Sequence, residues 1–546
     1  MEFEQTLQDH ASASQRQLAE QLEVPRSTLQ HWLTRQDAID ASPAVVAFFE
    51  SPDGVAFLHR LVLAAHFVMT LLGPCGIRLV CVLLELTGLH RFVAASYGPQ
   101  QHVAVALEEA VVAFGQEEGP RLAEGMAPQK ITVCQDETFH PETCLVAIEP
   151  VANFILLEQY TANRKAETWT SAMRDAIGEM PLEVIQSTSD EGRGILHHVK
   201  DALGAHHSPD VFHVQHELVK GTSVALASQT RRAEQALEQA AKEESAQRAQ
   251  QEAYRHRPHG PGRPPAFDTR IRQAQAQVGE ARKRLEAAQA HQERASKAVH
   301  GISEAYHPYD LETGAARSAE EVSALLDASF AALGDVTAEA ALPERCLRRT
   351  QKAKRVVVEM VATIAFFWLT VRAKVEALAL APAVEQAVYA HVIPAIYLEL
   401  VAKKAKRAEQ RHTLRKRAET LRTTLGARDG PWCSLSQEEC ALIAQVAATC
   451  AQLFQRSSSC VEGRNGQLAL RHHSLHRISN RKLAALTTVH NYWVKRHDET
   501  TAAERFFGAK PRDLFAWVLN RVNLPGRPAQ KRSQPKTSTS LFQAVV

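Results

Sequence analysis

Residues 130–136, KITVCQD, begin the stretch that decides the fold, and two more apolar segments, CLVAIEP (144–150) and FILLEQY (154–160), follow closely. Each has the length and the apolar composition of a buried strand, and the short connection 151–153 predicts a hairpin between the last two. The elements that follow are predicted to be a helix, a strand, a helix and a short strand, at residues 165–177, 182–188, 192–204 and 208–214. Strands joined through a helix predict some parallel pairing.

This order, three strands and then two helix–strand units, matches the ribonuclease-H-like fold. We therefore expect an α/β ribonuclease-H-like core inside a predominantly α-helical multidomain chain. The predicted segments are a helix-turn-helix at 1–40, a helical region and candidate second DNA-binding module at 41–125, the first part of the core at 126–222, an antiparallel coiled-coil hairpin at 223–300, a helical insertion at 301–435, the completion of the core at 436–523 and a disordered basic tail at 524–546.

Length and composition exclude several classes of protein. The chain has 546 residues, enough for several domains, and its 45% hydrophobic and 23% charged content excludes a wholly disordered or collagen-like chain. Nine cysteines without a C-x-x-C pair indicate neither a zinc ribbon nor a disulfide framework. The acidic start lacks the order of a signal peptide, and the apolar run 61–77 is interrupted by Gly73 and Pro74. These features predict a soluble, cytoplasmic protein with no membrane partner.

A net charge of +2 conceals a gradient along the chain. Residues 403–422 carry nine basic and two acidic side chains, whereas residues 1–60 carry four basic and nine acidic ones. Such asymmetry favours a polyanion such as DNA as the partner of the second half, and solvated helix faces are the alternative. The candidate DNA contacts in this segment are Lys403, Lys404, Arg415, Lys416 and Arg417.

The first segment has the pattern of a helix-turn-helix. LAEQLEVPRSTLQHWL (18–33) predicts a short helix over 15–21, a turn over 22–25 and a second helix over 27–35, with Ser27 as its cap. It resembles the helix-turn-helix of bacterial regulators and transposases, except at Glu23, where glycine is usual. A purely structural helical pair is the alternative. The candidate DNA contacts are Arg26, Ser27, Thr28, Gln30 and Arg35.

A heptad repeat marks the predicted hairpin. Ile271, Val278, Leu285, Gln292 and Val299 stand seven apart, and alanines fill the intermediate positions. An Ala-rich helix from about 224 to 253 precedes this seam, and neither helix can cross the Pro- and Gly-rich residues 256–268. We expect the hairpin to assemble a homodimer or to grip DNA, and a structural spacer is the alternative. Arg263 at the tip resembles the minor-groove arginine of an AT-hook, but a plain loop is favoured.

Two acids mark the ends of predicted strands. Asp136 ends the first strand and Asp190 follows the fourth, and in this topology those two ends lie side by side. Two neighbouring carboxylates repel each other, and a divalent metal ion relieves that repulsion. A third acid from a later helix would complete the set of ligands.

Three blocks carry a resemblance to a known family. QDETFHP (135–141), SDEGRGI (189–195) and SCVEGRNGQLALRHHSLHR (459–477) resemble the acidic blocks of DDE transposases from bacterial insertion sequences. The resemblance implies that Asp136, Asp190 and Glu462 are the catalytic, metal-binding residues. The long gap before Glu462 implies a large helical insertion, similar to that of the hAT and Mutator-like groups. Those groups carry Cys/Asp-x-x-His after the second acid, where this chain has Asp210 and His213.

The resemblance also implies a mechanism. Two Mg²⁺ ions, for which Mn²⁺ can substitute, would be bridged by Asp136 and held by Asp190 and Glu462. Water would cleave the phosphodiester at a transposon end, and the freed 3′-hydroxyl would attack target DNA. The implied partners are transposon ends and target DNA, and the implied location is the nucleoid. A metal-dependent nuclease of the same fold and a catalytically silent DNA-binding protein are the alternatives.

Several residues near the third acid are accessory candidates. His213 is either a site residue or a buried core histidine. Arg464 and Asn465 could hold a phosphate or orient the acid, with plain surface placement as the alternative. The basic run with Arg471, His472 and His473 predicts a DNA-backbone face, because two histidines one turn apart without a third ligand are weak evidence for zinc.

Overall fold

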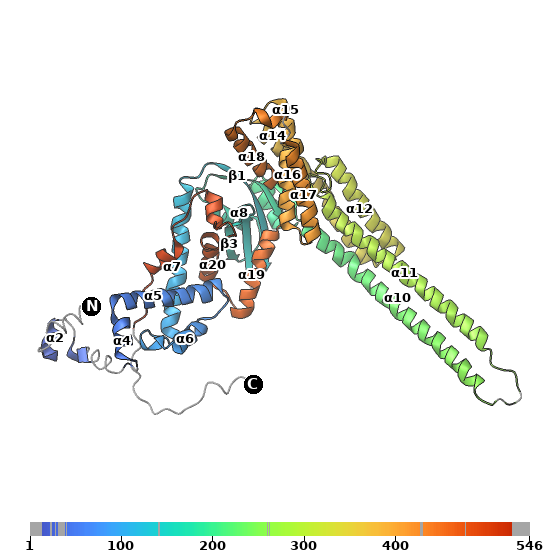
Figure 1. Cartoon of the computed structure of the whole chain (residues 1–546), viewed down its shortest axis with the longest axis horizontal. Coiled ribbons are helices and arrows are strands. Elements are labelled where there is room, and N and C mark those ends of the chain that lie inside the picture. Colours follow the sequence, from blue (N-terminus) through green and yellow to red (C-terminus); the bar gives the residue numbers. More distant parts are fainter. Residues whose placement is uncertain are drawn as a thin grey trace.

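The computed structural model describes residues 14–21, 25–27, 29–30, 39, 41–139, 142–258, 260, 262–425, 430–475 and 477–526. The chain is mostly helical and contains one five-stranded mixed sheet. The sheet lies in the middle of the molecule, and a long two-helix arm projects away from it (Figure 1). The coarse prediction of an α/β sheet inside a predominantly helical chain is therefore confirmed.

The five strands occur in the predicted chain order, and their bounds are Gln129–Phe139 (β1), Thr143–Glu149 (β2), Phe154–Thr161 (β3), Leu182–Ser189 (β4) and His206–Pro209 (β5). Their order across the sheet is β3-β2-β1-β4-β5. β1 pairs antiparallel with β2, and β2 with β3, which confirms the predicted hairpin. β1 pairs parallel with β4, and β4 with β5, as the helical crossovers predict.

The predicted fifth strand is wrong beyond Pro209. β5 ends at this residue, and helix α10 (Val211–Arg255) begins two residues later. The reason is local: the Asp210 side chain accepts a hydrogen bond from the Phe212 amide at 2.7 Å and so caps the helix. His213 therefore lies in the first turn of a long helix instead of on a strand.

Successive residues of β1 belong to different cores on the two faces of the sheet. Val133 packs with Trp169 of α8 (Ala166–Ile177) and Ile195 of α9 (Arg193–His197). Cys134 faces the other way, into a larger core built from both ends of the chain. This alternation, expected of a strand buried on both faces, decides which side of the sheet each polar residue of β1 reaches.

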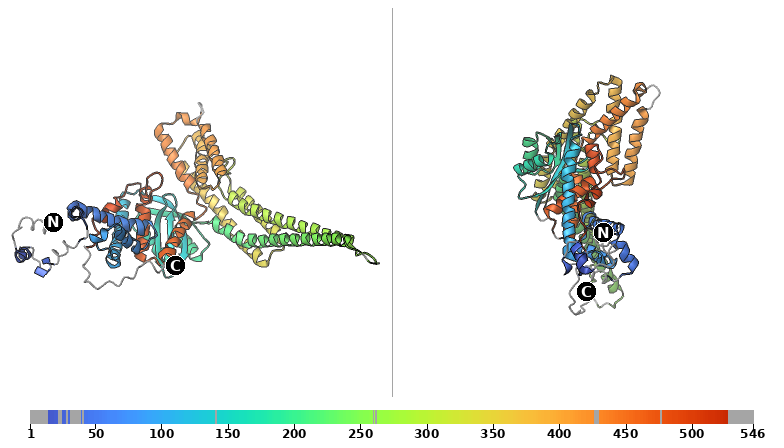
Figure 2. Two further views of the ribbon diagram at one scale, coloured as in Figure 1. Left: turned by 60° about the horizontal axis from the view of Figure 1, so that its bottom comes forward. Right: turned by 90° about the vertical axis from the view of Figure 1, so that its left-hand side faces the viewer.

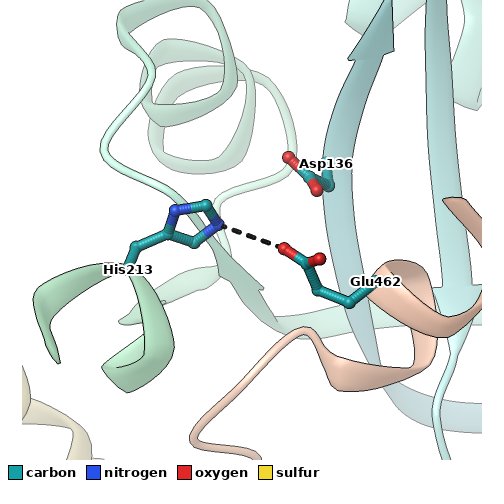
Figure 3. Close-up of side chains that lie close together, drawn as sticks. All are labelled: Asp136, His213 and Glu462. Atoms are coloured by element: carbon teal, nitrogen blue, oxygen red, sulfur yellow. Dashed lines mark ion pairs between the residues drawn. The ribbon is translucent and has the colours of Figure 1, made fainter. Parts of the chain in front are cut away.

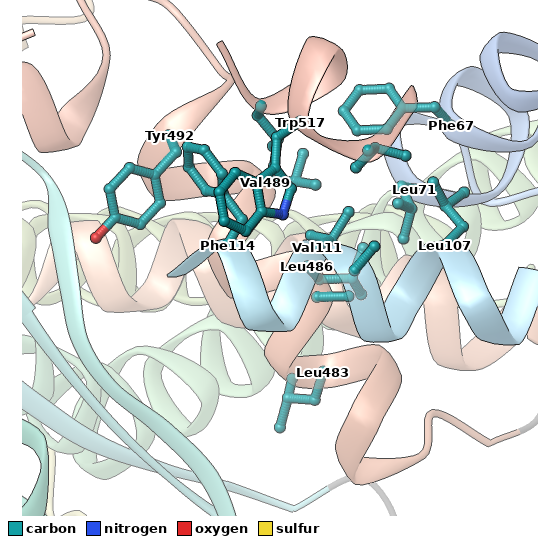
Figure 4. Packing of buried hydrophobic residues seen from close by; sticks show 14 of the residues in the cluster. Phe67, Leu71, Leu107, Val111, Phe114, Leu483, Leu486, Val489, Tyr492 and Trp517 are labelled. Carbon is teal, nitrogen blue, oxygen red and sulfur yellow. The ribbon is translucent and has the colours of Figure 1, made fainter. Parts of the chain in front are cut away.

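The larger core joins N-terminal and C-terminal helices, whose bounds are Pro43–Glu50 (α4), Pro52–His66 (α5), Ile77–Leu86 (α6), Tyr97–Ala123 (α7), Asn480–Tyr492 (α20), Ala502–Phe507 (α21) and Leu514–Leu519 (α22). In α7, Leu107, Val111 and Phe114 are buried against Leu486 and Trp517 (Figure 4). The helices of residues 43–123 thus share their core with the sheet, and their role as a DNA-binding module stays a prediction.

Only part of the predicted helix-turn-helix is described. Its first helix is α2 (Gln15–Gln21), as predicted. Arg26, Ser27 and Gln30 are described, whereas Thr28, Arg35 and the tail from 527 onward lie outside the described residues. DNA contact by this segment stays a prediction.

The hairpin forms from α10 and α11 (Phe267–Ala305), which extend together as an arm in the left view of Figure 2. Its seam is the predicted one, since Ile271 and the alanines at the intermediate positions are buried. Gln292, on the same seam, accepts a hydrogen bond from the Thr230 hydroxyl at 2.9 Å. The arm is longer than predicted because α10 begins at Val211, and Arg263 is exposed at its tip.

Before the chain returns to the sheet, its described residues form seven more α-helices, the π-helix Val388–Val392 (η4) and the 3-10 helix Pro431–Ser434 (η5). The α-helices have the bounds Ala319–Glu339 (α12), Glu344–Lys354 (α13), Val357–Glu376 (α14), Pro382–Ala387 (α15), Ile393–Lys404 (α16), Ala408–Leu425 (α17) and Gln437–Gln452 (α18). Helix α19 (Ser459–Leu475) then packs against β1 and β2. Everything between β5 and α19 is therefore a helical insertion into the fold of the sheet.

Two helical stretches of the described chain, Pro52–Leu72 and Glu344–Glu376, are long and apolar enough to cross a membrane by length and composition alone. In both, part of the apolar window is buried inside the protein. Core helices of a soluble protein have the same character, so the two stretches are consistent with the predicted soluble protein.

Candidate active site

Asp136 lies on β1, at the point where the parallel partner β4 ends. Its side chain is buried, with 8% of the residue exposed. The Glu137 amide donates a hydrogen bond to Asp136 Oδ1 at 2.8 Å, and Asn465 Nδ2 donates to Oδ2 at 3.3 Å. These two donors fix the carboxylate in one orientation toward α19.

Two more ligand-type side chains converge on Asp136. His213 comes from the first turn of α10 and Glu462 from the first turn of α19 (Figure 3). One ligand atom from each of the three residues lies within 4.8 Å of the other two. His213 Nε2 is 3.8 Å from Glu462 Oε1. Residues far apart in the sequence thus meet at one edge of the sheet.

The predicted acidic triad is only partly brought together. The parallel register pairs Cys134 with Thr188, and its continuation by two residues places Asp190 beside Asp136. However, Asp190 Oδ1 accepts a hydrogen bond from the Gly192 amide at 3.0 Å, and Asp190 does not belong to the mutually close group. The structure therefore groups Asp136 and Glu462 with His213, and Asp190 lies next to this group.

Burial and like charges make the site unfavourable for a bare carboxylate. Burial, together with the charges of Asp190 and Glu462, raises the pKa of Asp136 to about 7. Among the described residues, Asn465 Oδ1 and His213 Nε2 are buried without a hydrogen-bond partner. A bound cation would stabilise the carboxylates. The unpartnered atoms could then bind the cation itself or a water molecule that it coordinates.

Asp210 positions the site instead of entering it. The side chain is fully buried, and its Oδ2 accepts hydrogen bonds from the Ser458 amide at 2.9 Å and from the Ser458 hydroxyl. Because Oδ1 caps α10, this one carboxylate ties the start of α10 to the residue before α19. His213 and Glu462 are thereby held at a common position.

Arg464 is not available for a phosphate. Its guanidinium forms two hydrogen bonds to the Glu158 carboxylate of β3, at 2.7 and 2.6 Å, and both side chains are buried. The prediction that Arg464 binds a phosphate or lies on the surface is wrong, because the face of α19 that carries Arg464 packs against the sheet. Asn465, by contrast, orients the carboxylate of Asp136 and not that of Glu462, the acid that it was predicted to orient.

Glu137 lies on the opposite face from Asp136, as the alternation along a strand predicts. Its carboxylate accepts hydrogen bonds from Arg164 Nη1 at 2.8 Å and from Trp169 Nε1 at 3.2 Å. This neighbouring acid is therefore occupied by α8 and its preceding loop.

A pair of cysteines beneath the acids was missed by the sequence reasoning. Cys134 and Cys460, each two residues before an acid of the site, share a side-chain hydrogen bond. That bond lowers the pKa of Cys460, and the positive charge of Lys404 lowers it as well. Lys404, at the end of α16, therefore lies within electrostatic reach of the site.

The predicted DNA-backbone face at 471–473 is largely engaged inside the protein. Arg471 donates hydrogen bonds to the carbonyls of Leu71, Leu72 and Gly73, at 2.6 to 2.9 Å. His472 contacts the Tyr160 hydroxyl at 3.2 Å, and only His473 of the three is exposed. The segment lies between the sheet and the N-terminal helices, which explains why its cations are directed inward.

The basic residues of α16 and α17 are on the surface. Lys403, Lys404, Arg415 and Lys416 are exposed, and Arg417 is half-buried. These residues are consistent with the predicted electrostatic surface, and their contact with DNA stays a prediction.

Residues 388–534 match a protein family described as a family of unknown function, DUF6399. The matched stretch includes α16 to α22, and hence Glu462 and the exposed basic residues, but it covers well under half of the chain. No significant match to the chain is found among curated proteins or among solved structures.

Proposed function

We propose that this protein is a DDE transposase with a ribonuclease-H-like core. The observation that carries the proposal is the meeting of Asp136 and Glu462 beside the strand-end Asp190. The strand order β3-β2-β1-β4-β5, with the first three strands antiparallel, agrees with that fold. The transposase family whose acidic blocks these residues resemble has its catalytic acids at the corresponding positions.

The donor set fits divalent metal ions. Asp136, Asp190 and Glu462 would supply the carboxylate oxygens that Mg²⁺ prefers, and the unpartnered Asn465 Oδ1 could accept from metal-bound water. When bound, Mg²⁺ supplies activation of the attacking water or 3′-hydroxyl and stabilisation of the leaving oxygen. The raised pKa of Asp136 supports this fit, since a cation would relieve the repulsion that raises it.

His213 would hold Glu462 in place. Its Nε2 lies between Asp210 Oδ2, at 4.0 Å, and Glu462 Oε1, at 3.8 Å. The imidazole, placed between these two carboxylates, would keep the half-buried Glu462 side chain near Asp136, with the buried Asp210 on its other side. We infer that His213 is a positioning residue for the third acid.

DNA would approach over the end of α16, where Lys404 lies within electrostatic reach of Cys460, and along the exposed lysines and arginines of α17. The partners in this proposal are transposon ends and target DNA, and a homodimer would pair two ends through the arm. The protein would act in the cytoplasm, on the nucleoid.

The proposal is tested by cleavage and strand transfer on DNA that carries the inverted repeats flanking the coding sequence. Asp136→Asn, Asp190→Asn and Glu462→Gln should each lower cleavage by roughly a thousandfold or more without abolishing end binding. Glu183→Gln, an exposed acid of β4 paired with Lys130, is the matched control and should be near wild type. Near-normal cleavage by Glu462→Gln would refute the assignment, and cleavage without joining would identify a nuclease.

End binding should weaken steeply with salt. Each phosphate neutralised contributes about −0.9 to the slope of log affinity against log salt. Arg415→Gln and Lys416→Gln, on the exposed face of α17, should each reduce the magnitude of that slope by roughly this amount. A slope unchanged by both substitutions would place the DNA elsewhere.

A further inference from the structure

A second cluster of metal-ligand side chains lies on the other side of the end of β4. Glu191, which follows Asp190, His207 of β5 and Glu359 of α14 place one ligand atom each within 4.8 Å of the other two. None of these three residues takes part in the acid site. Of two adjacent residues, Asp190 therefore lies next to the first cluster, whereas Glu191 belongs to the second.

His207 points a buried nitrogen into the cluster. The His207 side chain is 1% exposed, its Nε2 lies 3.1 Å from Ser189 Oγ, and its Nδ1 lies 3.3 Å from Glu359 Oε2. Ser189 donates its hydroxyl hydrogen to the Asp190 carbonyl, so Ser189 Oγ accepts from Nε2–H. In a neutral ring of this tautomer, the Nδ1 lone pair is directed at a Glu359 oxygen and is available to a cation held between the two atoms, whereas a proton on Nδ1 donates to Glu359 instead.

Lys200 bonds to the cluster directly, because its Nζ donates to Glu359 Oε1 at 2.9 Å, and the charge of Lys352 also acts on Glu191. The Lys200 side chain is half exposed, so it can move into solvent and leave Glu359 to another ligand. Glu191 is exposed and the Glu359 side chain is 32% exposed, which gives an ion a path from solvent.

We propose that Glu191, His207 and Glu359 form a second metal site, which takes a divalent ion of the Zn²⁺ class. One imidazole nitrogen and two carboxylates suit Zn²⁺ with a water in the fourth position. The Ser189 hydroxyl orients the histidine, as outer-shell partners of metal ligands commonly do.

Such an ion would clamp the insertion to the sheet. Glu191 and His207 belong to the ends of β4 and β5, and Glu359 to the first turn of α14. An ion that joins all three would also restrain the turn that carries Asp190. The proposal is independent of the DNA chemistry, because it concerns binding and stability only.

The test uses the full-length, metal-free protein with Glu462→Gln, so that the acid site is impaired in every sample. Zn²⁺ is titrated against a chromophoric chelator, and Co²⁺ is used to record the absorption spectrum of the bound ion. One tight ion, a rise in melting temperature on Zn²⁺ addition and a nitrogen-containing Co²⁺ spectrum are expected. Absence of a tight ion would overturn the proposal.

Matched variants separate this site from the other histidines, of which the chain has 25 in all. Glu191→Gln changes one exposed ligand and should weaken Zn²⁺ binding more than about tenfold, whereas Glu183→Gln on β4 should not change it. Lys200→Gln removes the competing ammonium and should tighten binding. If Glu191→Gln bound Zn²⁺ as well as the parent, or if Lys200→Gln lost stability without gaining affinity, the cluster would be only an ion pair.

Discussion

At the sheet edge, Glu158 and Arg464 pair across 306 residues of chain and are both buried, whereas on the arm Glu238 and Lys242 pair one helical turn apart in solvent. A buried pair pays a desolvation cost and holds only if both partners stay in place. An exposed pair adds at most about 1 kcal/mol and forms wherever the helix forms. The site therefore depends on the whole fold, while the arm depends on its own sequence.

The largest expected effect comes from breaking the buried pair. Arg464→Met should lower the free energy of unfolding by about 3–5 kcal/mol, because it leaves the Glu158 carboxylate buried without its partner. Denaturant unfolding followed by circular dichroism measures this. The double variant with Glu158→Gln should recover much of the loss, and a single variant as stable as the parent would contradict the difference drawn between the two regions.

Substitution of Asp136 is expected to change the free energy of unfolding by a smaller amount and in the opposite direction. Without divalent ions at pH 8, Asp136→Asn should raise the free energy of unfolding by about 1–3 kcal/mol, because it removes a buried charge. The folded-state pKa of Asp136 is about 7, above its ordinary value of 3.8. The wild type therefore loses stability as pH rises from about 4 to 7, and the advantage of the variant should grow over that window.

Thermal melting at pH 4 and pH 8 checks this prediction. Addition of Mg²⁺ at pH 8 should stabilise the wild type more than the variant, because the ion binds the carboxylate that the variant lacks. An advantage of the variant that is independent of pH would show that packing, and not the charge, is responsible.

Removal of the arm is expected to change the stability of the sheet least. Replacement of residues 228–296 by a short flexible linker should leave the melting of the remaining protein and its metal binding nearly unchanged. The physical reason is that the arm packs on itself through the alanine seam, and contacts α12 and its C-cap only near its base, through Arg294 with Glu339 and Gln229 with the Ala340 carbonyl. Light scattering and end-binding assays should show impaired pairing of ends or weaker DNA affinity. Normal pairing and cleavage would leave the arm as a spacer.

The sequence predicted the elements whose pattern is local. The strands at 130–160 and the hairpin between 144 and 160 follow from apolar runs, and the seam through Ile271 follows from the heptad spacing. The prediction of the fifth strand was wrong beyond Pro209. Residues 211–214, VFHV, have the composition of a strand, whereas the cap made by Asp210 starts a helix there. A single side-chain hydrogen bond decided between the two structures.

For the site, the sequence supplied the residue types but not all of their partners. Asp136 was identified from its position at a strand end and Glu462 by resemblance, and the structure brings them together with His213. The partners of Arg464 and Arg471 lie 306 and about 400 residues away, and no local pattern encodes such contacts. The Glu191, His207 and Glu359 cluster was not foreseen for the same reason.

By itself, the sequence determined the strands, the hairpin and the chemistry available in each segment, because periodicity and residue type act over one or two turns of chain. Only the tertiary structure decided that Arg464 and Arg471 are directed inward and that His207 meets two glutamates. Those outcomes depend on how α14 and α19 pack on the sheet. That packing is set by burial of apolar surface across the whole chain, which no single segment records.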